Sequence, residues 1–369
     1  MTLAIYKTMA TTPGSNKPPA APPSPDPTLF SEKIVLTDGR VLWATRPLPD
    51  RLTLVAYLQE EHFGGAGGLA QKLPAFAAQL VAAGKGMWKP DGSLMARAHL
   101  SLGDRGSVVD VTLSRLKVDG DFAYRLRLEC NPRKLGVNGC KELIATLAQA
   151  GDAPVNVAAI LKQAGLRRLD VCVDVAGITP GELVVSCKKK VKSVFYRSAD
   201  HHLETVQFHR EKAKPKKPLK RLTALGKMEL KVYDRNRERE ARGKSPPYPN
   251  CTVTRLEVVK TRFPGSFGLS DLHTMADLFA TVTVQDRATL NPWKSAERWT
   301  AYLTCRSSLG HEGAVSALGL IPKDAALALN AVPSKSGGVL GHNPWNAWTD
   351  SLTQTGIGVL IDMAESAAV

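Results

Sequence analysis

The sequence predicts an α+β protein: a largely antiparallel sheet with one polar face and helices packed on the other, followed by a helical C-terminal region. Two patterns predict this class. Between residues 33 and 260, several segments alternate apolar and polar side chains, which is the period of a strand with one buried face, and Gly- or Asp-containing turns separate many of them. From residue 270 onward, apolar residues recur at helical spacing instead.

The composition divides the chain into three parts. Residues 1–28 are rich in Ala, Pro, Ser and Thr, which cannot bury a core, so we expect a disordered tail there. A sheet-containing domain is expected over residues 29–265 and a helical region over residues 266–369. No apolar run approaches the roughly 20 residues of a membrane span, so no membrane partner is expected.

The first half of the sheet-containing domain begins with a hairpin, because Asp38-Gly39 is a turn signal between two short alternating runs. A helix with apolar residues at helical spacing and a three-stranded meander follow. The expected elements are strands at 33–37, 40–43 and 51–58, a helix at 69–83, and strands at 94–102, 107–113 and 122–129.

In the second half, β-branched residues indicate strands and helical spacing indicates helices. Two helices are expected at 139–149 and 155–164, and strands at 167–175, 183–186, 194–196, 204–208, 227–233 and 253–260. The helices of the C-terminal region are expected at 271–279, 292–304, 313–318, 323–331 and 343–364.

Three of these strands carry four acids on their polar faces: Glu129, Asp170, Asp174 and Glu257. Carboxylates on neighbouring strands lie about 5 Å apart, so they can share a divalent cation with oxygen ligands, Mg²⁺ or Mn²⁺. Asp170 and Asp174 stand four residues apart, about 13 Å on a regular strand, so only one of them should contact the ion. The alternative for each acid is a surface salt bridge to a nearby arginine.

Tyr233 ends the strand expected at 227–233 and opens a helix-prone, highly charged stretch that contains Arg235 and Glu238. A phenol beside basic residues and a carboxylate can attack a phosphodiester. Because its pKa is near 10, it needs a base, a cation or a metal to react at neutral pH. The alternative is an ordinary surface tyrosine. Histidines with the spacing of a metal-binding His-apolar-His pair are absent from the sequence.

The formal net charge of +15 indicates a polyanionic partner. Residues 188–244 contain 19 Lys and Arg against 7 Asp and Glu, so most of the excess lies in this window. A solvated basic surface or a contact with anionic lipid is the alternative. The six cysteines have no metal-ligand spacing, which fits free thiols in a reducing cytosol. The basic residues expected to contact DNA phosphates are Arg125, Arg127, Lys231, Arg237 and Arg255.

Four motifs, in order within residues 52–262, resemble the replication initiation factor family of rolling-circle plasmids and some phages, the Rep_trans type. They are Arg127-Leu-Glu-Cys-Asn-Pro-Arg-Lys-Leu135, Arg168-Leu-Asp-Val-Cys-Val-Asp174, Tyr233-Asp-Arg-Asn-Arg-Glu238 and Thr254-Arg-Leu-Glu-Val-Val-Lys260. The chain departs from the family pattern at a longer, more basic segment over 210–227 and at Thr254, where an aromatic residue is common.

The resemblance implies that residues 29–265 form a catalytic nicking domain with its site on the polar sheet face. Tyr233 would nick one strand at the double-strand origin, remain linked to the 5′ phosphate, and rejoin DNA at termination. Arg235 and Glu238 complete the expected catalytic set. The four acids match the family's acidic positions, and one or more of them would hold the metal. A homodimer and a host replicative helicase are the implied partners. The C-terminal region matches little of the family, so origin recognition and dimerisation both stay open for it.

Two other functions fit parts of the same pattern. A non-catalytic DNA-binding regulator would keep the fold and the basic surface and would bind DNA without cutting it. An RNA-binding module would have the charge, but the sequence contains no aromatic platform of the RNP type.

Overall fold

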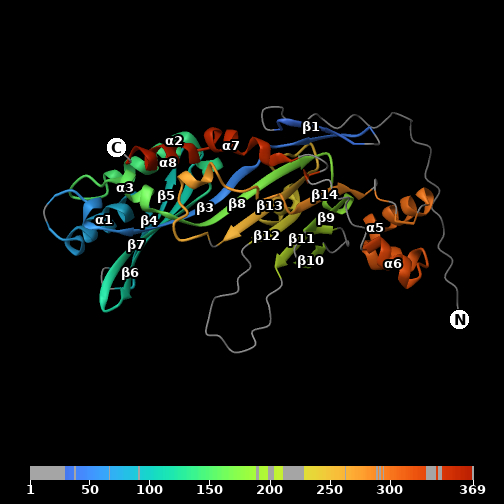
Figure 1. The fold of residues 1–369 in the computed structure, drawn as a ribbon, viewed down its shortest axis with the longest axis horizontal. Coiled ribbons are helices and arrows are strands. Elements are labelled where there is room, and N and C mark those ends of the chain that lie inside the picture. The colour runs from blue at the N-terminus through green and yellow to red at the C-terminus, as the bar shows by residue number, and fades with distance from the viewer. Residues whose placement is uncertain are drawn as a thin grey trace.

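The computed structural model describes residues 30–367 except 37–38, 66, 90–91, 188–190, 198–202, 211–227, 262, 288–289, 291, 294, 330–337 and 340–342. The tail expected at 1–28 and most of the basic segment at 210–227 lie outside the described residues. The fold class is confirmed: the chain forms a large antiparallel sheet with helices against it and a C-terminal helical region (Figure 1).

The main sheet has 12 strands within the described residues, and all its pairings are antiparallel. A hairpin of β1 (Glu32–Val35) and β2 (Val41–Ala44) joins it through β2, which pairs with β8. The other strands are, in spatial order, β10 (Val191–Arg197), β11 (Leu203–Arg210), β12 (Met228–Asp234), β13 (Val253–Thr261), β8 (Gly165–Ala176), β3 (Leu48–Leu58), β7 (Asp121–Cys130), β6 (Ser107–Val118), β5 (Leu94–Leu102) and β4 (Lys85–Trp88).

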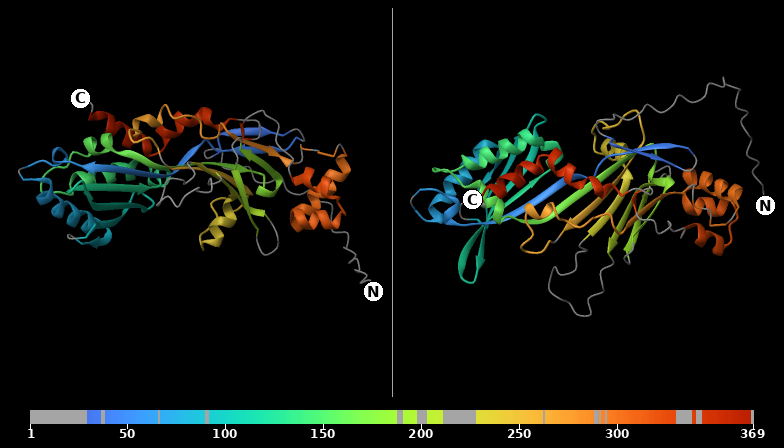
Figure 2. Two further views of the ribbon diagram at one scale, coloured as in Figure 1. Left: turned by 60° about the horizontal axis from the view of Figure 1, so that its bottom comes forward. Right: turned by 45° about the horizontal axis from the view of Figure 1, so that its top comes forward.

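Helices cover one face of this sheet. In Figures 1 and 2, α2, α7 and α8 lie together along one side of it. Their apolar side chains, such as Leu143, Leu352 and Leu360, belong to one core with the apolar sides of the strands. α2 bends at Gly136, which has a positive φ of 66°. Glycine adopts this backbone angle without steric strain because it has no Cβ. The helices are α1 (Leu69–Ala83), α2 (Pro132–Ala148), α3 (Val157–Gln163), α7 (Trp348–Gln354) and α8 (Ile357–Ser366).

The C-terminal region has two parts with different cores. Leu272, Met275 and Phe279 pack into the main core together with α7 and α8, so the boundary expected at residue 265 does not separate two cores. Helices α5 (Ala296–Ala317) and α6 (Pro322–Leu329) instead surround a separate aromatic core that includes Trp299 and Tyr302. None of the helices in the described part of the chain is long and apolar enough to span a membrane.

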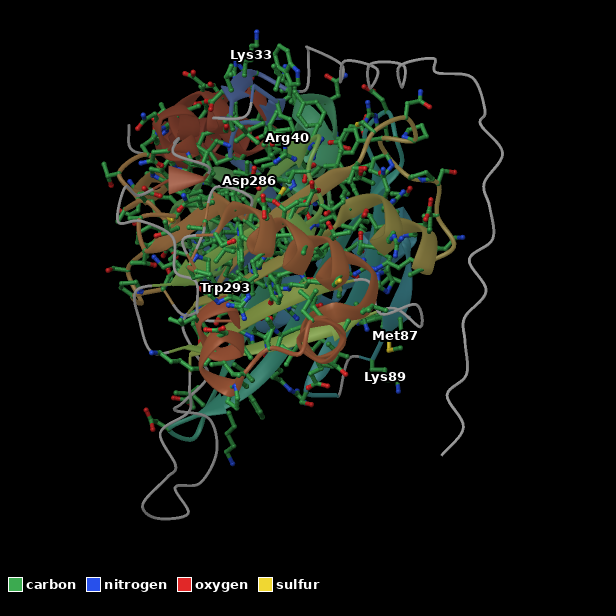
Figure 3. The ribbon with its side chains drawn as sticks, turned by 90° about the vertical axis from the view of Figure 1, so that its right-hand side faces the viewer. Lys33, Arg40, Met87, Lys89, Asp286 and Trp293 are labelled. Atoms are coloured by element: carbon green, nitrogen blue, oxygen red, sulfur yellow. The ribbon has the colours of Figure 1, made fainter. Side chains whose placement is uncertain are left out.

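A small second sheet links these parts. It contains β9 (Leu183–Cys187), β14 (Val282–Asp286) and β15 (Gly338–Val339). Arg40, which precedes β2, pairs with Asp286 at the end of β14 and with Glu182 before β9. Figure 3 shows Arg40 and Asp286 near each other at this end of the molecule. The helix expected at 271–279 is wrong, because only a 3-10 turn at Ser270–Leu272 forms there.

Candidate active site on the polar face of the sheet

Tyr233 lies next to the last residue of β12, on the sheet face opposite the main core. The following Asp234 ends the strand and caps helix α4 (Arg235–Ala241), because its carboxylate accepts hydrogen bonds from two backbone amides of that helix at 2.9 and 3.0 Å. The register places Tyr233 opposite Arg255 of β13, which lies opposite Asp174 of β8. The next row on the same face contains Lys231, Glu257 and Cys172.

The Tyr233 phenol donates a hydrogen bond of 2.7 Å to the Glu257 carboxylate. Both residues are buried, with 7% and 8% of their surfaces exposed. Lys231 Nζ lies 3.4 Å from the other oxygen of Glu257. Burial and the negative charge of Glu257 raise the pKa of Tyr233 above its ordinary value. The phenol is therefore protonated at neutral pH and already points its proton at a carboxylate.

Asp174 and Arg255 form the centre of a buried ion network beside the tyrosine. Arg255 donates to both oxygens of Asp174, at 2.6 and 2.8 Å, and lies 3.3 Å from Asp50. The Tyr248 hydroxyl donates to Asp174 at 3.0 Å, and Arg133 lies 3.8 Å away. Burial raises the pKa of Asp174, but the charges of Arg255 and Arg133 outweigh burial and lower this pKa to about 2.

This network changes the interpretation of two predicted site residues. Arg255 is 1% exposed, so its guanidinium is bound within the protein and does not present itself to a DNA phosphate. Asp174 is fully buried and accepts bonds from an arginine and a tyrosine, which leaves it no open position toward an ion. Both residues instead join β8 to β13 in the row of Tyr233.

The other two acids also pair with arginines. Asp170 receives two hydrogen bonds from Arg168, at 2.8 and 2.7 Å. Burial raises the pKa of Asp170, and the bond from Arg168 opposes this effect. Glu129 pairs with Arg51 and with Arg127. Each of these acids follows the salt-bridge alternative in the described structure.

The four acids do not fit a divalent cation as a set. β3 and β8 separate Glu129 on β7 from Glu257 on β13, which is about 14 Å across the sheet before any offset along the strands. Asp170 and Glu257 stand on neighbouring strands, one row apart, but Arg168 and Lys231 neutralise them. Within the described ranges no group of three His, Cys, Asp or Glu side chains could hold a metal ion.

The remaining predicted residues lie around the tyrosine or farther across the same face. Arg235 donates to Glu238 at 2.6 Å, and Glu238 also binds Arg242 at 2.7 Å. The charge of Arg235 reaches the Tyr233 phenol, whose pKa it lowers slightly against the effect of burial. Glu238 is thus held by two arginines and contacts no group of Tyr233. Arg237 is exposed on α4, whereas Arg125 and Arg127 lie on β7 in the other half of the sheet.

Sequence reasoning missed several residues that complete the site. Arg133 and Arg168 stand inside two of the recognised motifs, so their motif positions were the available signal. Asp50 and Tyr248 come from an irregular strand start and a proline-rich loop, where no periodic pattern marks a buried polar group. No protein-family model and no curated protein sequence matches the chain.

Replacing Arg255 with Met should lower the free energy of unfolding by about 3–5 kcal/mol, because Asp174 would remain buried without its main counter-charge. Urea denaturation measures this loss. Arg237→Met, at an exposed position of α4, is the matched control and should change stability by less than about 0.5 kcal/mol. Equal stability of the two variants would show that the network contributes nothing.

The same network makes stability depend on acid pH. The folded pKa of Asp174 is about 2, below its ordinary value of 3.8, so its ionised form is stabilised by folding. This contribution, on the order of 2 kcal/mol, should be complete above pH 3.8 and should disappear as the pH falls toward 2. Urea unfolding at several pH values should show a smaller acid loss for Asp174→Asn than for the unchanged protein; parallel curves would contradict this.

Proposed function

We propose that the protein initiates rolling-circle DNA replication by nicking one strand through Tyr233 and later rejoining it. The observation that carries this proposal is the 2.7 Å hydrogen bond from the Tyr233 phenol to the buried Glu257 carboxylate. A nucleophile bonded to a proton acceptor is the arrangement that covalent catalysis requires. The ordered motifs, the polar sheet face around Tyr233 and the net charge of +15 support DNA as the substrate.

In this mechanism the Tyr233 oxygen attacks the phosphorus, and its proton passes to Glu257. The bond from phosphorus to the 3′ oxygen breaks, and that oxygen leaves with a proton from water. The products are a 5′-phosphotyrosine and a free 3′ hydroxyl. Rejoining reverses these steps: the 3′ hydroxyl attacks the phosphorus and gives its proton to water, the bond from phosphorus to the Tyr233 oxygen breaks, and the phenol recovers its proton from Glu257. The number of phosphate ester bonds is conserved, so the strand closes without a nucleotide cofactor.

Cations near the phenol would stabilise charge on the phosphoryl oxygens as the new bond forms. Lys231 belongs to the same face of β12, and Arg235 begins α4 directly after the capping Asp234. Because the Tyr233 side chain is 7% exposed, bound DNA has to open the surface above it before attack. Nicking therefore requires a conformational change that exposes Tyr233, whereas DNA binding without nicking does not require it.

Mg²⁺ or Mn²⁺ is implied by the family resemblance, but the described acids are paired with arginines and lysine and do not form a cation site. A DNA origin, a second copy of the chain, a host helicase and a bacterial cytoplasm belong to the same proposal and follow from the resemblance alone.

The burial of Tyr233 favours one other function, a DNA-binding regulator that keeps the initiator fold but does not cut. A single assay separates the two. The protein is incubated with a supercoiled plasmid that carries the origin region of the replicon encoding it, with Mg²⁺, with Mn²⁺ and with EDTA. An initiator converts the plasmid into open circles that carry SDS-resistant protein. Salt-sensitive binding without open circles under all three conditions would establish the regulator instead.

A further inference from the structure

The polar face continues far beyond Tyr233, onto the half of the sheet formed by β3, β7, β6, β5 and β4. Strand pairing places side chains there in rows that cross the strands. One row holds Tyr57, Arg125, Ser114 and Leu94, and the next holds Val55, Arg127, Thr112, Arg97 and Met87. These two rows share a face with Tyr233 because register partners point to the same side of a sheet.

Large apolar side chains stand exposed on these rows among arginines. Tyr57 is 48% exposed, and Met87 and Leu94 are also exposed. Figure 3 shows Met87 at the rim of the molecule with Lys89 beside it. A sheet face that carries a solvated aromatic ring and a thioether has an apolar surface without a partner inside the protein.

The arginines of these rows retain capacity for a ligand. Arg125 lies opposite Tyr57 and pairs with no carboxylate of the described residues; its side chain is half-buried, and its buried Nε–H has no acceptor within the protein. The Arg97 side chain is 51% exposed, and its nearest carboxylate oxygen, on Asp110, is 3.7 Å away. Such exposed pairs are weak and exchange readily for a phosphate. Arg127 is exposed as well, although it contacts Glu129.

We propose that Tyr57, Met87, Arg97, Arg125 and Arg127 form a platform for single-stranded DNA, an inference that rests on the proposed nicking function. Bases stack on Tyr57 and Met87, and phosphates bind the three guanidinium groups. An exposed ring on an open sheet stacks only on an unpaired base, which favours a single strand over a duplex. The excess of arginine over acid in the two rows favours a polyanion over a protein partner.

The platform holds DNA some distance from the scissile phosphate. Tyr57 and Tyr233 are three strands apart and about ten residues apart along the strands, so roughly 35 Å separates them. A strand that reaches from one to the other spans about ten nucleotides at the ~3.4 Å rise of stacked bases. At this rise an oligonucleotide of about six nucleotides spans only about 20 Å, whereas one of about 20 reaches both places.

Binding is tested in the Tyr233→Phe background, so that no cleavage is needed. Fluorescence anisotropy measures the Kd of labelled oligo(dT) of about 20 nucleotides at low salt, with duplex DNA and oligo(rU) of equal length as the other arms. Tyr57→Leu and the pair Arg97→Gln with Arg125→Gln should each raise the Kd for oligo(dT) at least about fivefold. Tyr57→Phe should keep the affinity, because it keeps the ring. Arg105→Gln, at an exposed arginine in the turn between β5 and β6, is the charge control.

A second readout places the base directly. After ultraviolet irradiation, an oligo(dT) that contains 5-iodouracil should be crosslinked to the peptide that contains Tyr57. Unchanged affinity in the platform variants, crosslinks only elsewhere, or tighter binding of duplex DNA or oligo(rU) would overturn the platform. Platform-dependent binding by a protein that never nicks would sink the initiator function and leave the platform standing. If the platform variants nicked DNA at the unchanged rate, the initiator function would stand and the platform would be rejected.

Discussion

Replacing Tyr233 with Phe is expected to abolish nicking and the covalent protein–DNA product, because the phenol of Tyr233 supplies the attacking oxygen in the proposed mechanism. The change removes one hydroxyl and keeps the ring, so packing at the end of β12 should be preserved. The assay is conversion of supercoiled origin plasmid into open circles, followed by detection of labelled DNA that migrates with the protein under denaturing conditions. We expect a loss of at least about a thousandfold in the nicking rate.

Tyr124→Phe serves as the matched control, because it removes a phenol from β7, on the core side of the sheet and far from β12. It should leave nicking of the plasmid unchanged. Binding of single-stranded DNA by Tyr233→Phe should also persist, which separates a chemical defect from loss of fold. Full nicking by Tyr233→Phe would remove the tyrosine from the mechanism.

Replacing Glu257 with Gln should slow nicking by about 10²–10⁴-fold. The amide keeps the size of the side chain and can still accept the hydrogen bond of the phenol, but it cannot take up the proton. Without the carboxylate, the Tyr233 phenol has to lose its proton to solvent before it attacks. Burial raises the pKa of Tyr233 above its ordinary value, so little phenolate is present at neutral pH. The residual rate of Glu257→Gln should therefore rise about tenfold per pH unit, which a purely structural role would not produce. Single-turnover nicking over a pH series measures both effects.

Glu240→Gln is the control for this change, because Glu240 is an exposed carboxylate on α4 close to the site in sequence. Its nicking rate and pH profile should match those of the unchanged protein. If Glu257→Gln nicked at the full rate, or lost activity with no change in pH dependence, Glu257 would not be the proton acceptor.

The strands around the site could be predicted because alternation is a local property. The segments around Asp170, Tyr233 and Glu257 all form strands, and they share one polar face as expected. Their order in the sheet could not be predicted, because it depends on pairing between distant parts of the chain. β3 enters the sheet between β8 and β7, and this insertion moves Glu129 away from the acids of β8 and β13.

Burial of charge could not be predicted from the same pattern. Arg255 and Asp174 occupy polar-face positions, and nothing in their spacing distinguishes an arginine that faces solvent from one held inside by Asp174 and Asp50. The incorrect helix at 271–279 has a similar cause. Its apolar residues are buried, but they pack a turn-rich segment against the main core, so tertiary packing decides their backbone.

The most direct test of the central claim is to identify the residue that carries DNA after nicking. The protein is incubated with the origin plasmid, the DNA is digested to a short remnant, and the modified peptide is sequenced by mass spectrometry. We expect the phosphonucleotide on Tyr233, within the segment Val232–Arg235 that trypsin releases between Lys231 and Asn236. A remnant on another tyrosine such as Tyr248, or open circles formed without any linked peptide, would contradict the proposed role of Tyr233.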